Sequence, residues 1–247
     1  MNDSFFRTAH RHRHRAIAAV AAALAVCACL SATPRPSSGS SAGASGIFVS
    51  DKGKFKISIN GAPIGTEEFE IHPSGDRWTA QGNADVRPPG GAPTHITSRL
   101  TLQADGSPVA YEWSTQGQKK ASAEIQFQNS IATITLHLEN ARPFTQQFTF
   151  TSPLVAILDN NLYHQYAILA RLYDREKKGS QTFSVLVPQE MTPGTVTVNS
   201  VAPAGVANAA EELRVQTPDL EVDLYLDAKG RLIRLVAPAS NAEVVRE

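Results

Sequence analysis

The feature that most constrains the fold of this chain is an alternation of apolar and polar residues with a period of two. From Gly53 onward the period is two, and in residues 54–59 phenylalanine or isoleucine at every second position alternates with lysine or serine. Successive side chains of a β-strand point to opposite faces, so this segment predicts a half-buried strand. The pair Asn60-Gly61 follows, and residues 65–72 then alternate again. Two alternating segments joined by Asn-Gly predict a β-hairpin.

The same pattern recurs along most of the chain. Turn residues, as at 73–76 and 104–107, separate the segments at intervals of about 8–12 residues, which is typical of antiparallel strands rather than βαβ units. We therefore expect a mainly β protein with an antiparallel sheet of about ten strands, strongly curved into a half-barrel or open barrel. Further strands are predicted at residues 77–86, 95–103, 109–115, 120–127, 131–139, 144–151, 181–187, 194–201, 213–216, 220–226 and 231–236.

One central segment follows a helical pattern instead. Ser152 and Pro153 suit the N-cap and the first position of a helix. Lys177 and Lys178 suit its C-terminal end, where the helix dipole favours positive charge. A polar interruption at residues 159–161 marks a place where a second helix could begin. The apolar positions recur every three or four residues, at Leu154, Leu158, Leu162, Tyr166, Leu169 and Tyr173. We expect this segment to cover the sheet.

Residues 1–28 have the layout of a secretory signal peptide, with a basic start, an apolar run and small residues after it. The apolar run, residues 16–30, has about fifteen residues, fewer than the about 20 that a membrane-spanning helix needs. No later stretch comes near that length. The sequence therefore predicts an exported chain that does not span a membrane.

Residues 26–29, Val-Cys-Ala-Cys, resemble the bacterial lipobox, which implies that Cys29 becomes a lipidated N-terminus. Cys27 stands where that motif usually has a small or aliphatic residue, and an ordinary cleavage near Ser31 is the alternative. Because Leu30 is not the aspartate that retains lipoproteins in the inner membrane, the resemblance implies an outer-membrane lipoprotein. Its domain would lie on the periplasmic side of the bacterial cell envelope, and the N-terminal lipid would attach the protein to the membrane.

The rest of the chain divides into a tether and a domain. Residues 29–46 contain the anchor cysteine and a Ser-, Gly-, Ala- and Pro-rich linker with a coil reach of roughly 20–25 Å. Residues 47–240 are expected to form a single β-rich envelope domain, and residues 241–247 a tail. No cysteine follows Cys29, so the domain has no disulfide.

Charge and histidine spacing argue against several functions. Without residues 1–28 the chain has 19 basic and 22 acidic residues, which offers no basic field for nucleic acid. The four remaining histidines are far apart in sequence, so we expect no metal and no cofactor. We interpret His164 as a packed or surface residue of the helix. Glu67 and Glu68 point to opposite faces of a strand and cannot cooperate. With no nucleophile–base pair visible, we expect no enzymatic activity.

The two ends of the β-rich segment resemble those of uncharacterised bacterial periplasmic domains built like the lipoprotein-carrier (Lol-type) half-barrel. The resemblance covers residues 50–237 and implies that the sheet wraps an apolar cavity covered by residues 154–172. It supplies no catalytic residue. The matching patterns are Phe55-x-Ile57-x-Ile59-x-Gly61-x-x-x-Gly65-x-Glu67 and Leu224-x-Leu226-Asp227-x-x-Gly230-Arg231-Leu232-x-Arg234-Leu235.

Two functions remain open at this point. The first is a non-enzymatic binder or carrier of an apolar or amphiphilic ligand, such as a lipid or an apolar small molecule, in a partly unfilled interior. The alternative is a structural or adaptor lipoprotein that holds an envelope protein partner through a sheet edge or the helix. The ligand-binding residues that the first function predicts are Phe55, Ile57, Phe69, Trp78, Leu100, Trp113, Phe127, Phe148, Leu158 and Leu162.

Overall fold

A computed structural model describes residues 47–118, 120–203 and 205–247, which contain one β-sheet and one α-helix. The predicted signal peptide, Cys29 and the linker lie outside these residues. No helix in the described ranges is both long and apolar enough to cross a membrane.

The sheet has fifteen strands. The one α-helix among the described residues, α1 (His164–Leu172), lies between the ninth and tenth strands in sequence. Two short 3₁₀ helices, η1 (Pro188–Glu190) and η2 (Pro238–Ser240), join later strands. The strands are β1 (Asp51–Ile59), β2 (Ala62–Ser74), β3 (Arg77–Val86), β4 (Thr94–Leu102), β5 (Pro108–Gln116), β6 (Ala121–Gln128), β7 (Ile131–Leu138), β8 (Phe144–Thr149), β9 (Val155–Ile157), β10 (Gln181–Val187), β11 (Thr192–Val201), β12 (Glu211–Gln216), β13 (Glu221–Leu226), β14 (Leu232–Ala237) and β15 (Ala242–Arg246).

The order of strands in the sheet is simple, because nearly all neighbours in sequence are neighbours in space. The order runs β8 to β1, then β15 back to β9, so the last strand pairs with the first. Every pairing is antiparallel except that between β9 and β10. The sheet is open, with β8 at one edge and β9 at the other.

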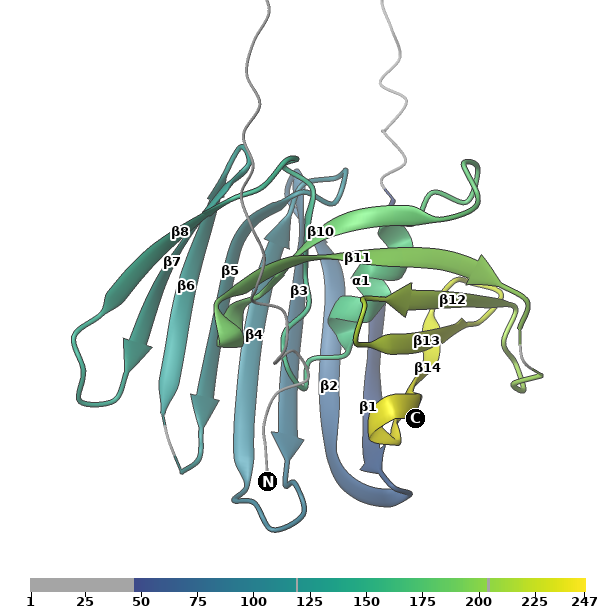
Figure 1. Ribbon diagram of the computed structural model, residues 1–247, viewed down its shortest axis with the longest axis horizontal. Coiled ribbons are helices and arrows are strands. Elements are labelled where there is room, and N and C mark those ends of the chain that lie inside the picture. The colour runs from purple at the N-terminus through teal and green to yellow at the C-terminus, as the bar shows by residue number, and fades with distance from the viewer. Residues whose placement is uncertain (1–46, 119, 204) are drawn as a thin grey trace, which may run out of the picture. The chain divides into compact units, whose positions relative to one another are not determined.

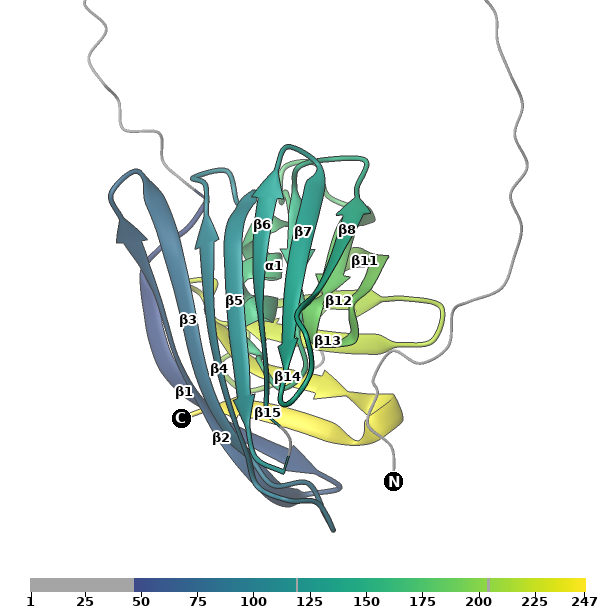
Figure 2. The same cartoon turned by 90° about the vertical axis from the view of Figure 1, so that its left-hand side faces the viewer.

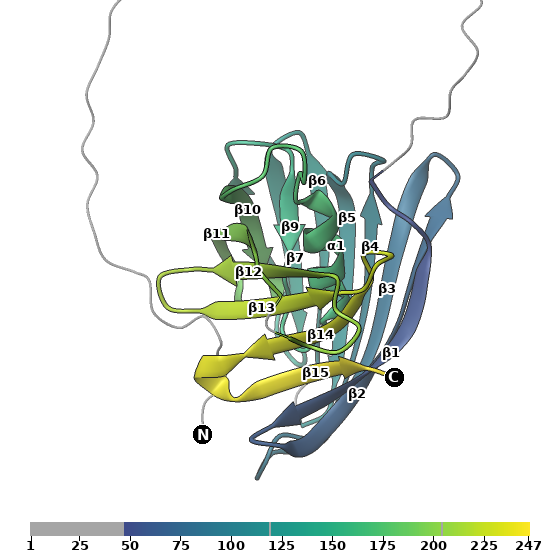
Figure 3. The same ribbon diagram turned by 90° about the vertical axis from the view of Figure 1, so that its right-hand side faces the viewer.

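The sheet folds over so that its two halves face each other. Figure 1 shows the long strands β1–β8 side by side, with the strands of the second half running across them. Figures 2 and 3, from opposite sides, both place α1 between the two halves. The core therefore lies around α1, and it includes the stacked rings of Phe55 and Phe69, whose centroids are 4.8 Å apart.

Local turn chemistry closes the hairpins as the sequence predicts. Asn60 and Asn129 adopt positive φ, the conformation that asparagine tolerates better than most residues. The β10–β11 and β14–β15 connections share a second device, in which proline opens a 3₁₀ turn. Met191 and Asn241, both in the left-handed region, end these turns.

The expectation of about ten strands is wrong, because the sheet has fifteen. Thirteen of them fall in segments with a predicted strand, and the other two come from segments to which the sequence assigned other structures. The predicted tail contains β15, which pairs with both β1 and β14. The start of the predicted helix contains β9, all of whose residues are buried beside β10. A fully buried strand needs no alternation, so three or four apolar residues in a row fit it as well as they fit a helix. The helix therefore begins only at His164, after the polar interruption at residues 159–161.

Candidate functional site

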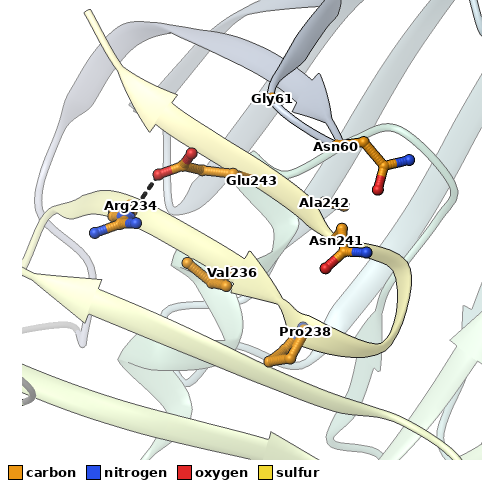
Figure 4. Close-up of a pocket in the computed structure, with 8 residues that line it drawn as sticks. All are labelled: Asn60, Gly61, Arg234, Val236, Pro238, Asn241, Ala242 and Glu243. Atoms are coloured by element: carbon orange, nitrogen blue, oxygen red, sulfur yellow. Dashed lines mark ion pairs between the residues drawn. The ribbon is translucent and has the colours of Figure 1, made fainter.

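A shallow hollow lies at the η2 turn (Figure 4). It has a volume of about 630 Å³, and an ion pair of 2.7 Å between Arg234 and Glu243 crosses β14 and β15 at its side. A second hollow of about 350 Å³ lies near Ile64 and His95. Neither of these hollows is enclosed by the two halves of the sheet.

None of the ten predicted ligand-binding residues lines either hollow. They come together, but as packed side chains of the core rather than as the wall of one of these hollows. Seven are buried, namely Phe55, Ile57, Phe69, Leu100, Trp113, Leu158 and Leu162, and three are partly buried against them, namely Trp78, Phe127 and Phe148.

The interior contains an ion-pairing contact that links α1 to the sheet. Glu67 of β2 and His164 of α1 are both completely buried, and Nδ1 of His164 lies 2.5 Å from Oε1 of Glu67. A carboxylate can only accept, so Nδ1 of His164 is the donor, whether the ring is neutral or charged. This contact fixes both the tautomer and the orientation of the ring.

The second oxygen of Glu67 holds the beginning of α1. Oε2 accepts hydrogen bonds from the backbone N–H groups of Tyr163 (2.7 Å) and His164 (3.2 Å). The first N–H groups of a helix have no partner within the helix, and α1 has no side-chain cap of its own. A carboxylate from β2 takes that role, with the favourable charge for a helix N-terminus.

Gly82 of β3 makes this approach possible. A Cβ atom at this position would lie 2.5 Å from Cε1 of His164 and 2.7 Å from its Nδ1, closer than atoms can pack. Phe69 lies beside Gly82 in the neighbouring strand, and the rings of Phe69 and His164 stack with centroids 6.1 Å apart and planes 12° apart. The imidazole therefore packs over Gly82, which has no side chain, and next to the ring of Phe69.

A second polar cluster surrounds the buried Asp159 and includes Gln165, the residue of α1 that follows His164. Its Oδ2 accepts a hydrogen bond from the Tyr111 hydroxyl (2.9 Å), and its Oδ1 accepts from the backbone N–H of Gln189 (2.9 Å). Gln165 of α1 donates to the Tyr111 oxygen (3.0 Å) and accepts from the Asp159 N–H (2.5 Å). The cluster thus joins β5, α1, η1 and the loop before α1.

Burial changes the acidity of this second cluster. It raises the pKa of the Asp159 carboxyl from 3.8 to about 7, and the hydrogen bonds donated by Gln189, Tyr111 and Asn160 oppose part of that rise. Burial, together with the nearby Asp159 carboxylate, raises the pKa of the Tyr111 phenol well above its ordinary value. Asp159 consequently changes protonation near neutral pH.

The chemistry available to these clusters is limited by their enclosure. An imidazole whose Nδ1 is held by a carboxylate and whose Nε2 is free resembles the base of a catalytic dyad. Nε2 of His164 makes no hydrogen bond to another described residue. However, His164 and Glu67 have no exposed surface, so no substrate reaches them in this conformation. In the described ranges, no three His, Cys, Asp or Glu side chains group to hold a metal ion.

Sequence reasoning missed Glu67, Asp159 and Tyr111 as partners of α1. One signal was present for the first of them. Glu67 shares its face of β2 with Phe69 and Ile71, so strand parity places this carboxylate inside the protein. Opposite faces for Glu67 and Glu68 are confirmed, but the partner of Glu67 is on α1 rather than on its own strand.

The surface offers a different site at the open edge of the sheet. β8 is the outermost strand, as Figure 1 shows, and large apolar side chains at this edge are exposed. Phe144 is 54% exposed and Leu138 is 49% exposed, on the same face as the core residue Ile134 of β7. We use the term β8 margin for the free edge of β8 together with the inward-facing apolar residues Phe127, Leu136, Leu138, Phe144 and Phe148.

The backbone groups of β8 that face away from the sheet can be assigned. The N–H of Phe150 donates to the carbonyl of Ser130, at the start of β7. In an antiparallel ladder, alternate residues direct their N–H and C=O groups to the same neighbour. The even-numbered residues of β8 therefore bond to β7. Thr145, Gln147 and Thr149 direct theirs to the open edge, and their side chains are exposed.

Comparisons with known proteins bear on the fold alone. No protein-family model matches the sequence, and no curated protein is significantly similar to it. A solved DUF1089 family protein from Pseudomonas aeruginosa is 10% identical, with a TM-score of 0.43 over 70% of this chain and 90% of that chain. The β-barrel-like protein of the domain of unknown function DUF1849 from Brucella abortus is also 10% identical. Its TM-score is 0.53 over 81% of this chain and 95% of that chain. The described domain therefore has a β-barrel-like fold shared with that domain of unknown function.

Proposed function

We propose that this protein is an exported, non-enzymatic envelope lipoprotein, anchored through Cys29, that holds a partner polypeptide at the β8 margin. The observation that carries the proposal is the combination of a free strand edge with adjacent exposed apolar side chains. An open edge is a template for an added strand, and the apolar side chains beside it would select the side chains of that strand. The partner would be an extended segment with apolar residues at alternate positions.

The interior supports this proposal over a carrier function. The buried aromatic and aliphatic side chains pack against one another, while the polar groups of Glu67, His164 and Asp159 fix α1 to the sheet. Buried hydrogen bonds hold α1 and the loop before it to β2 and β5. Displacing α1 is costly, because each buried polar group left without a hydrogen bond costs about 1–3 kcal/mol. Binding at an open margin requires no such displacement.

A carrier function of the Lol type is a second proposal, with the ligand outside the packed core. Phe127, Leu136 and Phe148 are only partly buried on the inner face of β6–β8. The acyl chain of an amphiphile would lie along this face rather than within the core. Native mass spectrometry of protein from its own host tests this function, since a carrier retains a lipid that the Phe148→Asp variant loses.

The partner proposal is tested by affinity purification from detergent-solubilised envelopes of the host. The Phe144→Glu variant places a charge in the β8 margin, and Val49→Glu places the same charge at a site outside the sheet that is 61% exposed. We expect one reproducible protein partner with the wild type and with Val49→Glu. With Phe144→Glu, we expect the recovered amount of this partner to fall at least tenfold. Equal recovery with both variants would show that the β8 margin is not the binding site.

A further inference from the structure

We infer that the partner of the β8 margin is a second copy of this chain, paired antiparallel through β8 about a twofold axis at Gln147. This inference rests on the proposed function, because it uses the same margin, and it names the occupant. It follows from which backbone groups are free, from the order of the side chains beside them, and from the charge of the strand.

The free backbone groups form a symmetric set. Thr145, Gln147 and Thr149 direct their N–H and C=O groups to the open edge, and these three residues read the same in both directions. In an antiparallel pair with the axis at Gln147, the two copies of Gln147 face each other. Thr145 then faces Thr149 of the second copy. Each such pair exchanges two hydrogen bonds, so all three free residues of both strands are satisfied.

The same register matches the two faces of the sheet. On the outer face, Thr145 and Gln147 already contact Thr135 and Thr133 of β7, and the outward-facing residues of β8 are all polar. On the inner face, Phe144 lies opposite Phe150 of the second copy. This contact would cover Phe144, the most exposed of the margin's apolar side chains. On the same face, Gln146 lies opposite Phe148 of the second copy, so the inner row of the pair is apolar except for the two glutamines.

The charge of β8 is compatible with pairing between two copies. No charged residue occurs between Arg142 and Asp159, so the two copies of β8 bring no like charges together. Edge strands that remain unpaired usually have a lysine, a proline or a bulge that prevents association. β8 has none of these protective features within Phe144–Thr149. An isologous pair is also the commonest form of homo-oligomer.

The test is the oligomeric state of the full-length protein in detergent, measured by sedimentation velocity up to about 100 µM, a range that detects micromolar association. Wild type is expected to be a dimer at the upper end. Gln147→Lys and Gln147→Glu each place two like charges face to face at the axis. For each variant alone, we therefore expect a dimer dissociation constant at least tenfold higher than that of the wild type. An equimolar mixture of the two is expected to restore the dimer, since lysine then faces glutamate.

Rescue by the mixture depends on the axis at Gln147. A wild type that is monomeric at the highest concentration, or a mixture that does not recover the dimer, would overturn the inference. Circular dichroism melting of each variant separates dissociation from unfolding. If wild type is monomeric, but affinity purification recovers an envelope protein with wild type and not with Phe144→Glu, then self-pairing fails and the proposed function stands. If wild type dimerises and retains no other protein, then self-pairing stands and a separate envelope partner is contradicted.

Discussion

Glu67 accepts a hydrogen bond of 2.5 Å from Nδ1 of His164, a residue 97 positions later in the chain, and neither side chain has any exposed surface. This contact fixes the beginning of α1 to β2, since the same carboxylate accepts two backbone N–H groups of the helix N-terminus. The pair therefore fixes α1 to the first half of the sheet.

Replacing Glu67 is expected to be strongly destabilising. Glu67→Ala leaves the His164 ring and two backbone N–H groups unpaired in the interior, which should lower the free energy of unfolding by about 3–5 kcal/mol. Glu68→Ala is the matched control, because Glu68 is exposed and its ion pair with Lys54, at 3.3 Å, lies at the surface. We expect a cost below about 1 kcal/mol there. Urea unfolding measures both, and equal midpoints would contradict a structural role for Glu67.

Adding one methyl group to Gly82 should disturb the same contact. In Gly82→Ala the new Cβ would lie 2.5 Å from Cε1 of His164, so the helix must shift, at a cost of about 1–3 kcal/mol. Gly194→Ala is the control, since its Cβ would lie 3.6 Å from Cγ2 of Val185 in ordinary contact. Thermal melting compares the two. A Gly82→Ala protein as stable as Gly194→Ala would show that α1 does not pack tightly on β3.

Stability should depend on pH through Asp159. Its pKa rises from 3.8 to about 7 on folding, so the native state binds the proton more tightly than the unfolded state. The stabilisation that comes from protonated Asp159 is fully present below about pH 4. As pH rises through 7 it is lost, which lowers the free energy of unfolding by up to about 4 kcal/mol. Asp159→Asn mimics the protonated acid and removes this dependence.

The measurement is the difference in unfolding free energy between wild type and Asp159→Asn at a series of pH values from 4 to 8. We expect the variant to gain relative to wild type as pH rises, because only the wild type then has to bury a charge. Exposed carboxylates titrate alike in both proteins and cancel in the difference. A constant difference across this range would show that Asp159 titrates outside it.

The last strand should contribute more to stability than its position at the C-terminus suggests. Arg246 of β15 forms hydrogen bonds of 3.0 and 2.6 Å with the two oxygens of Asp51 in β1, 195 residues earlier, and both side chains are nearly buried. Arg246→Met leaves Asp51 buried and unpaired, which should cost about 3 kcal/mol or more. Lys52→Met, which breaks an exposed pair with Glu70, is the control and should cost below about 1 kcal/mol. Chemical unfolding that gives equal values for the two would contradict this role of β15.

The sequence predicted the local parts of the fold because their causes are local. Alternation set the strands from β1 to β8, and Asn60-Gly61 set the first hairpin, since both depend on residues within a few positions of one another. Strand parity also placed Glu67 and Glu68 on opposite faces. β9 and β15 were missed because a short buried strand and a terminal strand have no distinctive period of their own.

Only the tertiary structure decided which distant residues meet. The pairing of β1 with β15, the contact between Glu67 and His164, and the Asp159 cluster each close a loop of tens of residues or more, and no local pattern encodes the partner. The same limit applies to the open edge. Alternation identified β8 as a strand, but only the sheet order showed that its outer side has no neighbouring strand among the described residues. Hydrophobic periodicity fixes which face of a strand is buried, whereas the assembly of the whole sheet determines what lies against that face.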